Sequence, residues 1–307
     1  MECFGHNEWA LILGGSSGFG LASAKKLASM GMNLFIVHRD RKGAMTRINQ
    51  EFAAIQSYGH NLHSFNINAL EKEGRATVLS AIADHLEGGK IKLLLHSIAF
   101  GNLKLIAPQQ KSSHHALHKL ATRLHVNEDK IQDEIDTLFQ EGVHELLSLA
   151  SQPLYNQQLF LNEEDMAQTI YNMGTNLLSW VQDLFQRQMF AEDARVLGLT
   201  SEGNEIAWRG YGAVSAAKAV LESISRTIAC ELGAYGIRSN ILQPGITDTP
   251  ALRLIPGNQQ MKAKALLRNP LGRLTTPEDV ADAVALMCMK ESAWSLPRST
   301  CTRMSAE

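Results

Sequence analysis

Between residues 13 and 20 the chain reads Leu13-Gly14-Gly15-Ser16-Ser17-Gly18-Phe19-Gly20. This stretch follows a short apolar run at residues 9–13 and opens an amphipathic helical pattern. Glycines at such a turn let the chain reverse tightly, let the backbone approach a phosphate, and let the helix pack closely on the strand. The amino terminus of the helix then offers free N–H groups and a partial positive charge. The stretch predicts a dinucleotide-binding α/β unit at the start of the chain.

Short apolar runs alternate with helical patterns over most of the remaining sequence. This alternation is typical of βαβ units, whose right-handed crossovers place helices on both faces of a parallel sheet. We therefore expect an α/β, Rossmann-type doubly wound parallel sheet, in one domain that spans residues 1–307. The expected strands are 9–13, 33–38, 61–66, 92–95, 195–199 and 237–242, and the expected helices begin near Phe19, Ala44, Lys72, Glu163, Val214 and Pro277.

Residues 102–162 interrupt this alternation. They contain no strand pattern but two helix-like stretches, at 114–124 and 128–150, where apolar residues recur near helical spacing. We interpret the segment as a helical insertion in a loop of the parent fold. Histidines gather there without a carboxylate or thiol set to complete a metal site, so we expect a solvated helix surface and no metal. These histidines are His114, His115, His118 and His125.

The overall composition limits the classes of partner. The 307 residues include 29 Lys and Arg against 31 Asp and Glu, without a run of like charge, which argues against nucleic acid or an anionic membrane as partner. The four cysteines are scattered and predict reduced thiols. No signal peptide pattern and no apolar run near the ~18 residues of a membrane span is present. We expect a cytoplasmic protein.

The end of the second strand bears on the choice of dinucleotide. It reads Val37-His38-Arg39-Asp40-Arg41-Lys42. NAD sites tend to place an acidic residue here for the ribose 2′-hydroxyl, whereas a guanidinium suits a 2′-phosphate. Arg39 and Arg41 favour NADPH, Asp40 keeps NADH possible, and an ordinary charged loop is the remaining alternative.

A tyrosine and a lysine stand seven positions apart near residue 215. On a helix this spacing is a rotation of about 700°, almost two turns, so Tyr211 and Lys218 can lie on one side. An ammonium near a phenol lowers the pKa of the phenol and can also bind ribose hydroxyls. Core packing plus surface charge is the alternative interpretation of the pair.

Together these motifs resemble the short-chain dehydrogenase/reductase superfamily, and within it the enoyl-acyl-carrier-protein reductases. The wider superfamily separates its tyrosine and lysine by three residues, but that position here is Val214; the enoyl reductases separate them by six, as Tyr211 and Lys218 are. The run Leu95-His96-Ser97-Ile98-Ala99-Phe100 also resembles theirs. Later matches lie at 236–240, 244–249 and 270–273, and the resemblance covers residues 8–102 and about 163–290.

The resemblance implies reduction of the carbon–carbon double bond of an enoyl thioester, on acyl carrier protein or coenzyme A, by a hydride from NADPH or NADH in fatty acid synthesis. Tyr211 would donate a hydrogen bond to the thioester oxygen, where negative charge develops. Lys218 would bind the ribose, and Ser201 would be a further donor. Residues 251–268 would form a lid. The cofactor contacts would be Gly14, Ser16, Ser17, Gly18, Phe19, Gly20, Arg39, Arg41, Asn66, Ile67, Ser97, Ile98, Ala99, Lys218, Gly245, Ile246, Thr247 and Thr249.

The sequence departs from the family pattern in three places. Leu13 replaces the usual threonine, and the insertion lies beside the expected substrate entrance. From Ser295 onward the chain is polar and broken by Pro297, where the family forms its last strand. We predict that this strand is absent and that the tail 295–307 is disordered. A homo-oligomer is expected, with the family's tetramer contacts in doubt.

Two other functions are compatible with the same residues. One is a ketone or 3-oxoacyl reductase of the same fold, in which Tyr211 protonates a ketone oxygen. The other is a non-catalytic dinucleotide-sensing protein that uses the helical insertion as a docking surface. Fold alone does not decide among them.

Overall fold

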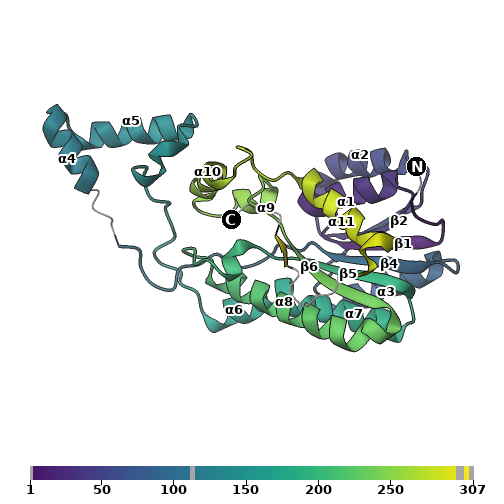
Figure 1. The fold of residues 1–307 in the computed structure, drawn as a ribbon. Helices are drawn as coiled ribbons and strands as arrows, with labels where there is room; N and C mark the ends of the chain where they lie inside the picture. The colour runs from purple at the N-terminus through teal and green to yellow at the C-terminus, as the bar shows by residue number, and fades with distance from the viewer. Residues whose placement is uncertain (1–2, 111–114, 295–300, 304–307) are drawn as a thin grey trace.

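The computed structural model describes residues 3–110, 115–294 and 301–303. Within them, parallel strands form one seven-stranded sheet in the order β3-β2-β1-β4-β5-β6-β7 (Figure 1). The order reverses between β1 and β4, which is the switch point where doubly wound sheets bind their ligands at the carboxyl ends of the strands. The strands are β1 (Glu8–Leu13), β2 (Asn33–His38), β3 (Leu62–Asn66), β4 (Lys90–His96), β5 (Phe190–Leu199), β6 (Ile237–Gln243) and β7 (Cys301–Arg303).

Helices cover both faces of the sheet because side chains alternate along each strand. In β1, Ala10 and Ile12 join the core under α1 (Gly18–Ser29), α2 (Met45–Gln56) and α11 (Pro277–Cys288). Trp9, Leu11 and Leu13 face α3 (Lys72–His85), α7 (Asn176–Gln186) and α8 (Gly212–Leu232) on the other side (Figure 1). In the described part of the chain, no helix has both the length and the apolar character needed to cross a membrane.

The expected Rossmann-type architecture is confirmed, and one expectation about it is wrong. The last strand is present: β7 pairs in parallel with β6, with Ile241 opposite Cys301 and Gln243 opposite Arg303. Pairing of an edge strand depends on backbone groups, so three residues suffice without an apolar pattern. The rest of the predicted disordered tail, residues 295–300 and 304–307, lies outside the described residues.

The insertion is helical, as expected. It contains α4 (His115–Leu124), α5 (Glu128–Gln140) and the short 3₁₀ helix η2 (His144–Ser148), and an isolated bridge pairs Leu105 with Phe160 across its base. Figure 1 shows α4 and α5 projecting away from the sheet, beyond α10 (Asn258–Arg268). Its small core includes Ile135, Phe139 and, from α10, Ala263. The insertion is thus joined to the predicted lid.

The insertion histidines form no metal site in the part of the chain that the structure describes. His115, His118 and His125 are exposed, and His118 Nδ1 lies 3.1 Å from Glu128 Oε2. No group of three His, Cys, Asp or Glu side chains with metal-binding geometry occurs among the described residues. His114 is outside them.

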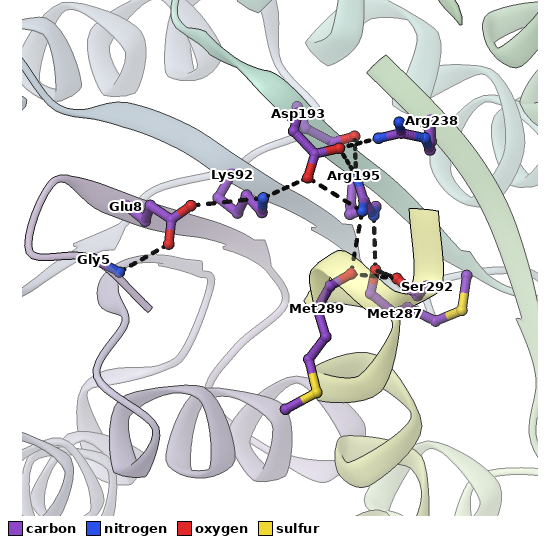
Figure 2. Close-up of polar contacts among 10 residues, drawn as sticks. Gly5, Glu8, Lys92, Asp193, Arg195, Arg238, Met287, Met289 and Ser292 are labelled. Atoms are coloured by element: carbon purple, nitrogen blue, oxygen red, sulfur yellow. Dashed lines mark hydrogen bonds and ion pairs between the residues drawn. The ribbon is translucent and has the colours of Figure 1, made fainter. Parts of the chain in front are cut away.

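A buried ionic network ties α11 to the amino end of the sheet (Figure 2). Lys92 lies 2.8 Å from Asp193 and 3.6 Å from Glu8. Arg195 is only 1% exposed; its Nη1 lies 2.6 Å from Asp193, and its Nε donates to the Met287 carbonyl at 2.8 Å. Although burial opposes it, hydrogen bonds from Arg195 and Lys92 hold the pKa of Asp193 well below its usual range. The network satisfies charges that would otherwise be costly to bury.

The remaining α-helices lie near the candidate active site, which is described in the next section. They are α6 (Glu163–Ile170) and α9 (Pro250–Arg253), and a single π-helical turn, η3 (Tyr171–Thr175), joins α6 to α7. Such turns are frequent at functional sites.

Candidate active site

The glycine-rich turn packs as tightly as the sequence predicts. Gly14 has φ +87°, and a Cβ there would stand 2.6 Å from the Ser97 carbonyl oxygen at the end of β4. A Cβ at Gly20 would collide with the carbonyl of Gly14, so only glycine lets α1 approach β1 this closely. The backbone is therefore left open at the amino end of α1, where a pyrophosphate fits.

A groove of about 440 Å³ runs from this turn along the carboxyl ends of the strands. Its size and its helix amino terminus fit a dinucleotide. Most of the predicted cofactor residues at its phosphate end and along β4 line it: Gly14, Ser16, Ser17, Gly18, Phe19, Arg39, Ile67, Ser97, Ile98, Ala99 and Thr249.

Seven predicted cofactor residues do not line this groove: Lys218, Gly245, Ile246 and Thr247 line the pocket described next, and Gly20, Arg41 and Asn66 line neither cavity. Gly20 acts in packing, and Arg41 is exposed beyond the rim. Asn66 shapes the turn after β2: its Oδ1 accepts from the Asp40 N–H at 2.9 Å and its Nδ2 donates to the Asp40 carbonyl at 3.1 Å. Asn68, which the sequence reasoning missed, lines the groove in its place.

A second cavity, of about 350 Å³, continues from the groove toward α8. We call it the reaction pocket, because the predicted tyrosine, lysine and serine all line it. Phe19, Ile98 and Thr249 line both cavities. The other predicted residues along the reaction pocket are Ser97, Ala99, Ser201, Tyr211, Lys218, Gly245, Ile246 and Thr247.

Tyr211 precedes the first residue of α8, and its hydroxyl lies 3.2 Å from Ser201 Oγ. The ring packs on Gly203, where a Cβ would collide with it. Glu222 of α8 holds the loop after β5, because its Oε1 accepts from Thr200 Oγ1 and Asn204 Nδ2, each at 2.6 Å. Phenol and serine are thus held together at the carboxyl end of β5.

Lys218 is 7% exposed, and its Nζ donates to the Leu199 carbonyl at 2.7 Å. Burial lowers the pKa of Lys218 to about 8, and the charge of Glu222 opposes this shift. Burial raises the pKa of Tyr211; the Ser201 hydrogen bond opposes the shift, and the charge of Glu202 adds to it. The expectation that Lys218 lowers the phenol pKa is therefore wrong here, because the ammonium is turned to the backbone of β5.

Thr247 and Thr249, which the resemblance implies as cofactor contacts, follow β6. Thr247 Oγ1 donates to the Gly245 carbonyl at 3.0 Å, and Thr249 caps α9 by accepting from the Leu252 N–H at 3.2 Å. Both border the reaction pocket. The two side-chain hydrogen bonds hold the backbone turns at the start of the predicted lid.

Comparisons with known proteins show the family of the chain. Residues 8–127 match the family described as "short chain dehydrogenase", and residues 146–295 match the one described as "Enoyl-(Acyl carrier protein) reductase". An estradiol 17-beta-dehydrogenase 8 of Callithrix jacchus is 32% identical over 99 residues, which are 32% of this chain and 72% of that protein. The chain belongs to the short-chain dehydrogenase/reductase superfamily.

Other relatives match this short-chain dehydrogenase/reductase over shorter shares. A tropinone reductase homologue of Arabidopsis thaliana is 33% identical over 28% of this chain and 32% of its own length. A 3-oxoacyl-[acyl-carrier-protein] reductase of Chlamydia pneumoniae is 28% identical over 45% of this chain and 55% of its own. The chain thus spans about a third of the length of the first two curated relatives that it matches.

Solved structures extend the fold similarity over nearly the whole short-chain dehydrogenase/reductase chain. A short-chain dehydrogenase of Burkholderia cenocepacia J2315 in complex with NADP has a TM-score of 0.66 at 18% identity and covers 95% of this chain and 94% of its own. A dehydrogenase/reductase of Sinorhizobium meliloti 1021 has a TM-score of 0.66 at 18% identity, covering 94% and 91%. At this identity the likeness concerns the fold.

The sequence reasoning missed two buried polar residues behind the reaction pocket of this superfamily member. His96 Nε2 and Asn176 Oδ1 are buried without a hydrogen-bond partner among the described residues. Burial lowers the pKa of His96 to about 3, and the charge of Lys218 adds to the shift. The position of His96 directly after the apolar run 93–95 was the available signal; nothing in the sequence pointed to Asn176.

Proposed function

We propose that the protein reduces the carbon–carbon double bond of enoyl thioesters with NADPH. The observation that carries this proposal is the pairing of the Tyr211 hydroxyl with Ser201 Oγ, 3.2 Å apart, in a pocket that continues into the dinucleotide groove. Val214, four positions before Lys218, also lines this pocket and has no proton to donate. The only phenol bordering the described pocket is thus the one spaced as in the enoyl reductases.

NADPH fits the residues that line the groove. The Arg39 guanidinium lies over the Phe100 ring, 4.6 Å from its centroid, at the end of β2. The Asp40 carboxylate is engaged by His38 at 3.0 Å. A guanidinium with no carboxylate partner suits a 2′-phosphate. When bound, NADPH would supply the hydride.

Tyr211 would act on the thioester oxygen. As the hydride reaches the β-carbon, negative charge develops on that oxygen, and a preorganised donor is most effective there. Because burial raises the pKa of Tyr211, its hydroxyl keeps its proton at neutral pH and can donate it in a hydrogen bond. Ser201 Oγ would donate to the phenol oxygen, 3.2 Å away, which leaves the phenol proton for the thioester oxygen.

Lys218 would bind the ribose of the cofactor. Its ammonium is held by one carbonyl, that of Leu199, and lines the reaction pocket. With a pKa of about 8 it is mostly charged at neutral pH. It can therefore donate hydrogen bonds to hydroxyls and add positive potential near the thioester oxygen.

A ketone reductase is the second candidate, because the curated relatives favour it. They include the 3-oxoacyl-[acyl-carrier-protein] reductase above and (3R)-3-hydroxyacyl-CoA dehydrogenases of several mammals, one 27% identical over 54% of this chain. In that reaction Tyr211 would protonate the ketone oxygen. The reaction pocket would hold the ketone, and the same cofactor would supply the hydride.

Oxidation of NADPH with crotonyl and acetoacetyl thioesters, in parallel, tests the choice. We expect turnover of the crotonyl thioester to its saturated product, and a much lower rate with the ketone. Turnover of the acetoacetyl thioester alone would replace the proposal by the ketone reductase. Dinucleotide binding without turnover of either substrate would favour a sensing protein.

A further inference from the structure

A third cavity, of about 520 Å³, lies on the other side of Tyr211. One wall is the first limb of the insertion, residues 104–110, and the other is the loop 207–212 before α8. We call this cavity the insertion groove. It shares Gly203, Trp208 and Tyr211 with the reaction pocket, so the two spaces adjoin at the phenol. Its volume lies in the range of small-molecule sites, ~300–1,000 Å³.

The limb that forms the first wall is fixed by several bonds. Lys104 Nζ lies 2.6 Å from Asp165 Oδ2 of α6, and the Leu105 carbonyl accepts from the Leu161 N–H at 2.8 Å. Farther along, the Gln109 N–H donates to Gln157 Oε1 at 2.8 Å. The wall is therefore built into the insertion and does not depend on a bound ligand.

The opposite wall is held by the same insertion. The Tyr155 hydroxyl lies 3.1 Å from the Arg209 carbonyl, and its ring packs on Gly210, where a Cβ would stand 2.9 Å from the ring. Trp208 is supported by Lys264 of α10, whose Nζ lies 4.8 Å from the ring centroid. Both walls thus stand at a fixed separation.

Apolar atoms make up most of the surface of the insertion groove, and Lys104, Gln109, Gln110, Arg209 and Ser215 are polar residues along it. Lys104 is paired with Asp165, and Gln109 Nε2 donates to Gln152 Oε1 at 3.4 Å, so these polar groups already have protein partners. Ile106 is 79% exposed, although it is a large apolar residue, and it lines the groove beside Pro108 and Trp208. An exposed apolar surface adjoining a reaction pocket marks a binding site for apolar groups.

We propose that the insertion groove binds the alkyl chain of the acyl thioester, beyond the double bond that is reduced. The inference rests on the proposed function, which puts the thioester carbonyl at Tyr211 and thus a neighbouring chain carbon within reach of the groove. The insertion would then set the preferred chain length. The ligand class is an unbranched apolar chain.

The test compares chain lengths in the full-length protein. We expect kcat/KM with 2-enoyl-CoA thioesters to rise from four to twelve carbons, by up to about fourfold for each buried methylene. Ala107→Trp places an indole in the groove, and we expect it to lower the long-to-short ratio of kcat/KM at least tenfold. Ile106→Ser, at an exposed position, removes apolar wall without adding bulk and should lower the same ratio.

Ala54→Trp is the matched control, because Ala54 is exposed on α2 and lines none of the three cavities. The long-to-short ratio of kcat/KM in Ala54→Trp should equal that of the unmodified protein. A chain-length profile that Ala107→Trp and Ile106→Ser both leave unchanged would overturn the proposal. That result would place the alkyl chain elsewhere, including under the lid.

A binding measurement separates failure of this inference from failure of the proposed function. Titration calorimetry of saturated butyryl-CoA and dodecanoyl-CoA into the protein with NADP⁺ needs no turnover. Tighter binding of the longer thioester, lost in Ala107→Trp, would support the groove even if no enoyl thioester is reduced. Equal binding of both thioesters would contradict it even in an active enoyl reductase.

Discussion

Arg39 and Asp40 are neighbours in the chain, but they have different partners. The guanidinium of Arg39 stacks on Phe100 inside the cofactor groove, while the carboxylate of Asp40 is hydrogen-bonded to the buried His38. The two residues that favour different dinucleotides thus have different partners, and Arg39 forms no ion pair with any of the residues that the structure describes. We therefore expect these two side chains to favour NADPH over NADH.

Replacing Arg39 should therefore weaken the binding of NADPH and leave that of NADH nearly unchanged. We expect Arg39→Ala to weaken NADPH binding about 10- to 100-fold, because charge-assisted hydrogen bonds contribute roughly 1.5–3 kcal/mol. NADH binding should change less than twofold. Fluorescence titration with both nucleotides measures this, and Arg41→Ala, beyond the groove, is the comparison. Equal losses for NADPH and NADH would contradict the assignment.

His96 should make the protein sensitive to acid. Its pKa is about 3 in the folded protein and 6.5 in the unfolded chain, so the unfolded chain takes up a proton first as the pH falls. The stabilisation is present above pH 6.5 and is lost from pH 6.5 toward 3. Between pH 7 and 5, we expect the free energy of unfolding to fall by about 2 kcal/mol from this residue alone.

Urea unfolding at the two pH values checks the expectation. His96→Gln should reduce the pH-dependent loss, whereas His115→Gln, at an exposed position on α4, should not. An identical loss in the unmodified protein and in His96→Gln would show that other groups are responsible.

At the scale of elements, α11 depends on Arg195. The last carbonyls of a helix lack partners within it, and Arg195 supplies donors to Met287 at 2.8 Å and to Met289 at 3.3 Å while it pairs with Asp193 (Figure 2). The network lies at the amino end of the sheet, opposite the carboxyl end that carries the candidate active site. Its contribution is to stability.

Arg195→Met should destabilise the protein by about 3–5 kcal/mol, because it leaves Asp193 short of a partner in a partly buried site. Urea unfolding with circular dichroism measures the loss. Arg238→Met removes a more exposed partner of the same carboxylate and should cost less than 1 kcal/mol. Equal losses in the two variants would mean that burial of Arg195 does not matter.

Tyr155 connects the insertion to the predicted lid and to the loop before Tyr211. Its hydroxyl lies 3.1 Å from the Arg209 carbonyl and 3.4 Å from that of Pro256, at the turn between α9 and α10. Tyr155→Phe keeps the ring but frees both loops. We expect KM for the thioester to rise about fivefold, the equivalent of one hydrogen bond of about 1 kcal/mol, with kcat within twofold.

Steady-state kinetics with the thioester check this prediction. Tyr58→Phe is the control, since Tyr58 is exposed at the end of α2. A fall in kcat without a change in KM would place the effect of Tyr155 on Tyr211 and not on the lid.

The sequence predicted most elements of the sheet and its helices, because apolar periodicity reports burial directly. The strand at Asn33–His38 and the helices beginning at Lys72, Glu163 and Pro277 were placed at their observed bounds. β7 was missed because its pairing uses backbone groups. The direction of the Lys218 ammonium was missed because spacing places a side chain on a helix face without revealing its partner. The positions of Arg41 and Asn66 outside the groove depend on the course of the loop after β2, which the sequence pattern does not reveal.

At the scale of the whole molecule, the three cavities lie in series. The dinucleotide groove adjoins the reaction pocket at Phe19 and Thr249, and the pocket adjoins the insertion groove at Tyr211. The parent fold builds the first two, and the insertion builds one wall of the third. The Tyr211 hydroxyl thus lies between the proposed sites of the cofactor and of the alkyl chain.

The most direct test of the account is NADPH oxidation with crotonyl-CoA by the unmodified protein and by Tyr211→Phe, with the product identified by mass spectrometry. The account predicts a butyryl thioester, a fall in kcat of about 100- to 1,000-fold in the variant, as for loss of one preorganised donor, and NADPH affinity within twofold. Equal rates in the two proteins, or no saturated thioester from the unmodified one, would contradict it.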